Sequence, residues 1–107
     1  MKKKNGTSFR EGAPRTERVT LWGVVQGVGF RPYVAKLAHR LGLRGEVRNE
    51  GGLVRITLTD TEARIDDVLR RLQGELPPPA EIVRCERLTL PALREFADFS
   101  ISESAEG

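Results

Sequence analysis

The stretch VVQGVGFR, residues 24–31, is followed at once by Pro32 and separates two hydrophobic patterns. An alternating apolar run precedes it and an amphipathic helical pattern follows it, which predicts a turn from a strand into a helix. Gly27 and Gly29 let backbone N–H groups converge without obstruction by Cβ atoms, and such a row of N–H groups binds anions. Pro32 suits the start of a helix, whose dipole adds positive charge at the same point, and Arg31 supplies a forked cation. The stretch therefore predicts a phosphate-binding loop; a tight turn with Arg31 in solvent is the alternative.

The length and composition limit the possible classes of protein. A chain of 107 residues allows one domain with one core. Its longest apolar runs fall short of the ~18 residues of a membrane span, and its basic N-terminus lacks the apolar stretch of a secretory signal. The single cysteine, Cys85, and the single histidine, His39, cannot form a structural disulfide or an N/S metal site. We expect a cytoplasmic domain that uses no metal and no other cofactor.

The net charge of +3 is unevenly distributed. Residues 1–16 carry five basic side chains and one acidic one, whereas residues 17–107 carry 13 basic and 14 acidic ones. The aperiodic segment 1–16 is predicted to be a disordered, solvated basic tail, and residues 104–107 an exit into a linker or a terminus. The predicted domain, residues 17–103, has no basic excess, so neither nucleic acid nor membrane is expected as its partner.

Hydrophobic periodicity predicts a single order of strands and helices. The helices are expected at 32–41 and from the N-cap Thr61 to Gly74, and the strands at 17–25, 44–50, 54–59, 81–90 and 99–101. This β-α-β-β-α-β order with a short fifth strand predicts an α+β, ferredoxin-like split β-α-β sandwich. Two helices should cover one face of a mostly antiparallel sheet.

Four conspicuous features are assigned structural roles. Trp22 is expected to pack in the core or on the sheet face rather than to stack on nucleic-acid bases. His39 lies off the apolar stripe of its helix and is expected to be solvated. Cys85 is expected to be a small buried hydrophobic residue, and the prolines at 77–79 to form a stiff connection.

Residues 23–31, GVVQGVGFR, resemble the signature of the acylphosphatase family. The continuation FRPYV, residues 30–34, resembles one branch especially, the N-terminal acylphosphatase-like domain of HypF carbamoyltransferases, which mature nickel–iron hydrogenases. The resemblance covers about residues 17–103, including GEVRN at 45–49 and FSI at 99–101. It implies a hydrolase for acyl phosphates, and in the HypF-like branch carbamoyl phosphate as substrate and downstream carbamoyltransferase domains of a longer chain as partners.

The resemblance also implies the roles of individual residues. Arg31 would bind the phosphoryl group, and Asn49, on the inward face at a strand end, would orient the attacking water. Without the resemblance, Asn49 reads more simply as a turn residue that bonds its own backbone. A phosphate or sulfate anion would fit the same loop. The implied phosphate-binding loop consists of Gln26, Gly27, Val28, Gly29, Phe30 and Arg31.

Three other functions remain open: a stand-alone acylphosphatase, a non-catalytic module that binds or senses a phosphorylated ligand, and a single-stranded RNA-binding sheet. The last is disfavoured because Trp22 is the only aromatic residue available on the relevant strands. Two departures from the family pattern, Val24 and the glycine positions of the hairpin at 49–53, bear on substrate preference more than on the type of reaction.

Overall fold

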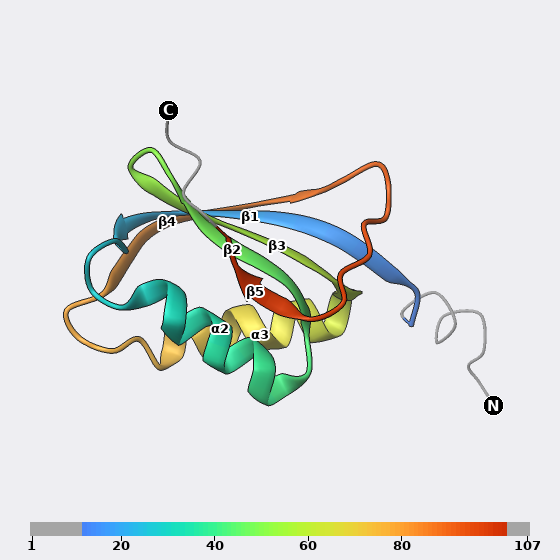
Figure 1. Ribbon diagram of the computed structural model, residues 1–107, viewed down its shortest axis with the longest axis horizontal. Coiled ribbons are helices and arrows are strands. Elements are labelled where there is room, and N and C mark those ends of the chain that lie inside the picture. Colours follow the sequence, from blue (N-terminus) through green and yellow to red (C-terminus); the bar gives the residue numbers. More distant parts are fainter. Residues whose placement is uncertain (1–11, 103–107) are drawn as a thin grey trace.

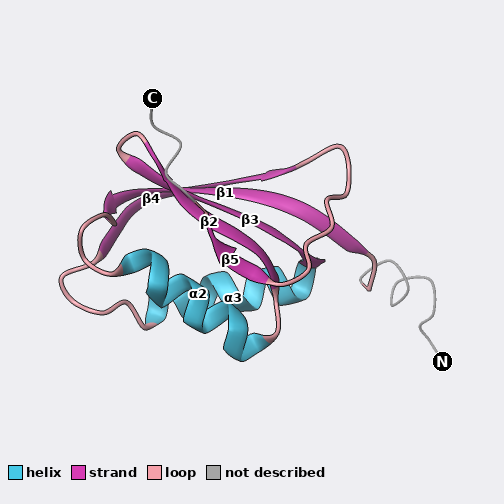
Figure 2. Cartoon of the chain, in the orientation of Figure 1, coloured by secondary structure: helices cyan, strands magenta, loops and turns pink. Residues whose placement is uncertain are grey.

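The protein is built on one five-stranded sheet with the order β4-β1-β3-β2-β5. The computed structural model describes residues 12–102. β5 runs parallel to β2, and all other neighbours are antiparallel. Both helices cover the same face of the sheet (Figures 1 and 2), which confirms the predicted ferredoxin-like sandwich. The elements are β1 (Pro14–Val24), α2 (Phe30–Leu41), β2 (Arg44–Glu50), β3 (Leu53–Thr61), α3 (Glu62–Gly74), β4 (Glu81–Thr89) and β5 (Phe99–Ile101).

The core lies between the helices and the covered face of the sheet. Strand register places Leu21 opposite Val54 and Val54 opposite Asn49, so these three side chains share a row on one face. Leu21 and Val54 are fully buried, and the row ends at the partly exposed Asn49. The helices contribute the apolar stripes that their periodicity predicts, namely Val34, Leu37 and Ala38 from α2 and Ile65, Val68, Leu69 and Leu72 from α3.

Several element boundaries differ from the sequence-based prediction, among them the starts of β1 and α2. β1 begins at Pro14, so residues 14–16 belong to the sheet and not to the tail. Thr16 is buried and its hydroxyl contacts that of Thr59 at 2.7 Å, a polar pairing that hydrophobic periodicity does not reveal. α2 begins at Phe30 rather than Pro32. The remaining tail prediction, for residues 1–11, and the exit predicted at 104–107 lie outside the described residues.

The positions of Trp22, Cys85 and His39 agree with the structural roles predicted for them. Trp22 packs on the open sheet face, where the guanidinium carbon of Arg84 lies 4.8 Å from the ring centroid. Cys85 is partly buried against the core, and burial raises the pKa of its thiol. His39 is exposed, as predicted, and its Nε2 also lies 2.7 Å from the carbonyl oxygen of Phe99, a contact that joins α2 to β5 and that the sequence did not predict.

Within the described residues, neither helix is long and apolar enough to cross a membrane.

Candidate active site

The turn between β1 and α2 has the backbone that its glycines predict. Gly27 and Gly29 have φ values of 75° and 73°, in the left-handed region that favours glycine. A Cβ atom at either position would meet nothing within 4 Å. Conformation, and not lack of space, therefore requires glycine at both positions.

The amides of residues 26–30 form a row of unused donors. No carbonyl or side chain within residues 12–102 accepts a hydrogen bond from any of them. The first bond of α2 runs from the amide of Tyr33 to the carbonyl of Gly29 at 3.2 Å, and no side chain caps the helix. Free N–H groups at a helix N-terminus favour a bound anion, as the sequence predicts for this loop.

Arg31 lies in the first turn of α2 and is partly buried. Its guanidinium makes no ion pair or hydrogen bond with another residue of the range 12–102, whereas most other described arginines are paired. The first turn of α2 contains no acidic residue either. A cation is thus held beside the positive end of the helix dipole without a counter-charge from residues 12–102, an arrangement that an anionic ligand would balance.

Asn49 lies near the end of β2, on the helix-covered face of the sheet. Its Oδ1 atom is buried, and no described residue donates a hydrogen bond to it. The prediction that Asn49 bonds its own backbone therefore does not hold for this oxygen. A buried acceptor without a donor costs about 1–3 kcal/mol, so an unused carboxamide at a strand end calls for a ligand or a bound water.

The Gln26 side chain joins the loop to the turn of the β2–β3 hairpin. Its Nε2 donates to the carbonyl oxygens of Gly51 at 3.0 Å and Leu53 at 2.8 Å. Because Gly51 follows Asn49 by two residues, these bonds place the loop and Asn49 at the same end of the sheet. Sequence reasoning assigned Gln26 only a backbone role; the carbonyl groups it contacts belong to every residue type and leave no signal in a sequence.

Tyr33, part of the FRPYV motif, acts between the helices. Its hydroxyl donates to the carbonyl oxygen of Leu72 on α3 at 2.7 Å. Burial, and secondarily the carboxylate of Glu75, raise the pKa of Tyr33. The tyrosine is therefore neutral at pH 7 and acts as a hydrogen-bond donor that fixes α2 against α3.

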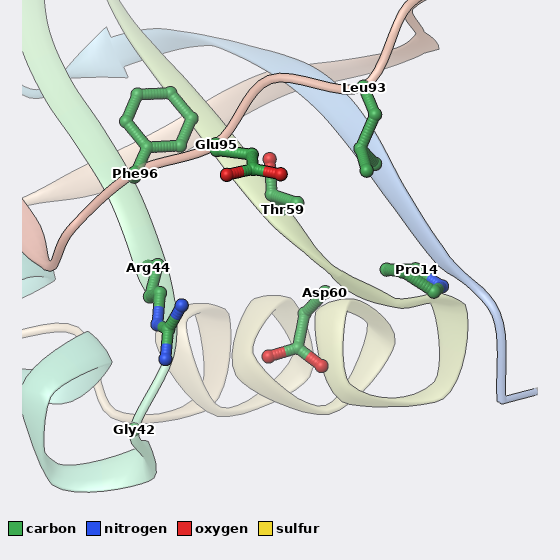
Figure 3. Close-up of a pocket in the computed structure, with 8 residues that line it drawn as sticks. All are labelled: Pro14, Gly42, Arg44, Thr59, Asp60, Leu93, Glu95 and Phe96. Carbon is green, nitrogen blue, oxygen red and sulfur yellow. The ribbon is translucent and has the colours of Figure 1, made fainter.

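A cavity of about 410 Å³ lies at the opposite end of the sheet (Figure 3). Arg44, the first residue of β2, lines it, whereas Asn49 lies near the other end of that strand. Several polar groups around it are already paired: Thr59 donates to the carbonyl of Arg94 at 2.6 Å, and Asp60 pairs with Arg64 at 3.1 Å. The cavity and the predicted phosphate-binding loop are separate features. The residues that line the cavity are Pro14, Gly42, Arg44, Thr59, Asp60, Leu93, Glu95 and Phe96.

Comparison with known proteins gives matches over most of the chain. The family model described as Acylphosphatase matches residues 17–101. The carbamoyltransferase HypF of Synechocystis sp. is 40% identical over 93 residues, which make up 87% of this chain and 12% of that protein. The acylphosphatase of Caldivirga maquilingensis is 36% identical over 86 residues, 78% of this chain and 90% of that protein. Full-length HypF, solved in a phosphate- and nucleotide-bound form, superposes with a TM-score of 0.82 at 28% identity, over 89% of this chain and 12% of that one.

The chain thus spans a small part of the HypF relatives and nearly the whole length of the acylphosphatase. The family match and the shared fold agree with the resemblance that residues 23–31 carry. The chain belongs to the acylphosphatase family.

Proposed function

We propose that the loop of residues 26–30 and Arg31 bind the phosphoryl group of an acyl phosphate and that Asn49 orients the water that attacks it. The observation that carries this proposal is the row of amides at the start of α2 that no described residue accepts from, beside Arg31, which pairs with no other residue of the range 12–102. Amide donors and a guanidinium stabilise the charge that a phosphoryl group carries in its transition state. The unpaired Asn49 Oδ1 supports the second half of the proposal.

The reaction needs little more from the protein than position and charge. Water attacks phosphorus, the bond from phosphorus to the acyl oxygen breaks, and a carboxylate leaves with the electron pair of that bond. A carboxylate is a good leaving group and needs little protonation. Asn49 is neutral and cannot take the proton of the water, so the proton passes to the phosphate oxygens of the substrate. Asn49 then acts by orienting the water for attack on phosphorus.

Carbamoyl phosphate is the substrate that we propose within this class, with carbamate and phosphate as products. The FRPYV motif and the identity with HypF of Synechocystis sp. support this choice. In a longer HypF-type chain that matures hydrogenases, downstream domains would receive the carbamate. The identity with acylphosphatases of similar length supports the broader alternative, a stand-alone hydrolase of several acyl phosphates.

Phosphate release from carbamoyl phosphate and acetyl phosphate tests the proposal. The wild-type protein should hydrolyse carbamoyl phosphate with the higher kcat/KM. Asn49→Ala should lower kcat by about 10²–10³-fold with a smaller change in KM, because the loop still binds the phosphoryl group.

Arg48→Ala is the matched control, since Arg48 is the neighbour of Asn49 on β2 and pairs with Glu50 at 2.9 Å. It should retain wild-type kcat. Wild-type protein that binds phosphate but hydrolyses neither substrate would instead identify a non-catalytic binding module. Equal kcat in the wild type and Asn49→Ala would remove the proposed role of Asn49.

A further inference from the structure

Both hydrogens of the Gln26 side-chain NH₂ group are used in hydrogen bonds to the hairpin. An amide NH₂ group has two hydrogens, and the carbonyls of Gly51 and Leu53 accept one bond each, at 3.0 and 2.8 Å. No donor is left on this side chain for a substrate oxygen, and its own oxygen would repel an anion. The side chain is therefore not a ligand of the phosphoryl group, although the backbone amide of Gln26 belongs to the loop.

These two bonds lie where the sheet ladder stops. Pairing between β1 and β3 ends at Leu21 and Val54, and β1 shifts register against β4 at the next step, between Trp22 and Gly23. The carbonyl of Leu53 is thus beyond the last residue pair of β1 and β3. The Gln26 side chain continues the contact between these two segments after their backbones separate.

Residues 25–29 connect β1 to α2. Within residues 12–102, the Gln26 bonds are the only hydrogen bonds that join this connection to the hairpin segment, residues 49–54. Val25 and Val28 also hold the loop, by packing against the core. Apolar contact is non-directional, whereas two hydrogen bonds from one planar group fix direction as well as distance. The spacing between the loop amides and Asn49 therefore depends on Gln26.

We propose that the Gln26 side chain is a positioning residue that sets the distance between the phosphate-binding loop and Asn49. The inference rests on the proposed function, because the distance matters only if the loop holds the phosphoryl group and Asn49 holds the water. A displacement of about 1 Å between reacting groups can cost about 10²-fold in rate. Loss of the two bonds should therefore lower kcat while leaving the loop able to bind an anion.

The test compares Gln26→Met with Gln73→Met. Methionine keeps the approximate length of glutamine but has no donor, and Gln73 is the other glutamine of the chain, exposed on α3. Gln26→Met should lower kcat for carbamoyl or acetyl phosphate by about 10–10²-fold. Its affinity for inorganic phosphate, measured by titration, should change little. Gln73→Met should match the wild type in both measurements.

A double-mutant cycle separates positioning from general loss of structure. If Gln26 acts through Asn49, Gln26→Met should have little further effect on kcat in the Asn49→Ala background. The inference would be overturned if the losses of kcat in the two single variants multiplied in the double variant. It would also be overturned if Gln26→Met alone kept wild-type kcat. Gln26→Asn, which keeps the carboxamide but is one methylene shorter, should behave like Gln26→Met and serves as the second variant if the first does not fold.

A readout without turnover distinguishes this inference from the proposed function. In NMR spectra of the wild type, the side-chain NH₂ protons of Gln26 should exchange with water more slowly than those of Gln73. Gln26→Met should shift the backbone amide signals of the loop and of residues 51–53. Inactive wild-type protein would overturn the proposed function, and with it the catalytic meaning of the contact. Equal exchange at the two glutamines would overturn the contact itself.

Discussion

The N-terminus of α3 has a side-chain cap, whereas no described side chain caps the N-terminus of α2. At α3, the hydroxyl of Thr61 accepts a bond from the amide of Arg64 at 3.3 Å, and Glu62 places an acidic group in the first turn. At α2, the cap residue is Gly29 in the left-handed conformation, with no side-chain cap and no acidic residue in the first turn. Arg31 stands there instead, where the helix dipole disfavours a cation.

The two helix starts show that unused hydrogen-bonding groups, rather than hollow surface, mark the candidate site. The 410 Å³ cavity is next to the start of α3, since Asp60 lines it, and two amides at that helix start, those of Thr61 and Arg64, already donate to side chains. Among the described residues, the loop before α2 and the adjacent Arg31 combine amide donors without acceptors and a cation without a counter-charge. Local rules for helix stability are met at one end of the sheet and broken at the other, as expected where a site binds a ligand.

The largest expected difference is between Arg31→Ala and Arg64→Ala, which remove an arginine from the first turn of each helix. Arg31→Ala should lower kcat/KM for acyl phosphates by at least about 10²–10³-fold, because a charged donor to the transition state is lost. Its stability should be unchanged or slightly higher, because a cation leaves the positive end of the dipole.

Arg64→Ala should lower the stability and leave the activity unchanged. Arg64 donates to the carbonyls of Leu41 and Gly42 at 2.7 and 3.2 Å, so its removal should lower the free energy of unfolding by about 1 kcal/mol. Its kcat/KM should equal that of the wild type. Steady-state kinetics and urea unfolding of both variants measure these effects. An equal loss of activity in the two variants would contradict the proposed difference between the two helix starts.

A smaller effect is expected from Gly29→Ala compared with Gly74→Ala. The φ of 73° at Gly29 should make alanine cost about 1–2 kcal/mol of unfolding free energy. Gly29→Asn should cost less, because asparagine tolerates the left-handed region. Gly74, the last residue of α3, has no close neighbour at the Cβ position, so Gly74→Ala should be neutral or slightly stabilising. Urea unfolding measures all three, and equal costs at the two positions would contradict the strain argument.

The smallest effect is expected from Thr61→Ala, which removes the cap of α3. The free energy of unfolding should fall by about 1 kcal/mol, with no change in hydrolysis. Thermal unfolding and phosphate release measure the two quantities. A loss of activity here would mean that the ends of the sheet are coupled, and that the contrast between the helix starts is not local.

Most of the fold could be predicted because its elements carry regular apolar patterns. The strand at 44–50, the turn at Gly51–Gly52 and the cap at Thr61 are confirmed. The start of β1 was missed because Thr16 is buried through a hydroxyl contact with Thr59 and not through an apolar stripe. Hydrophobic periodicity reports only surfaces that avoid water, so elements stabilised by polar pairing fall outside its reach.

The candidate site was predictable in its residue types but not in its internal connections. The glycines and Arg31 stand together in the sequence, and a left-handed backbone at Gly27 and Gly29 follows from their identity. The bonds of Gln26 to the hairpin and of His39 to β5 end on backbone carbonyls that lie far away in the chain. Carbonyl groups are common to all residues, so only the folded structure shows which of them a side chain contacts.

The uncapped start of α2 has a consequence for the folded state as a whole. An anion bound at Gly29 would complete the helix, so that part of the conformational stability would come from a molecule outside the chain. By mass action this contribution grows with occupancy, reaching about 2.7 kcal/mol at a ligand concentration 100 times the Kd. A higher substrate concentration would then stabilise the folded domain against unfolding as well as raise the rate of its reaction.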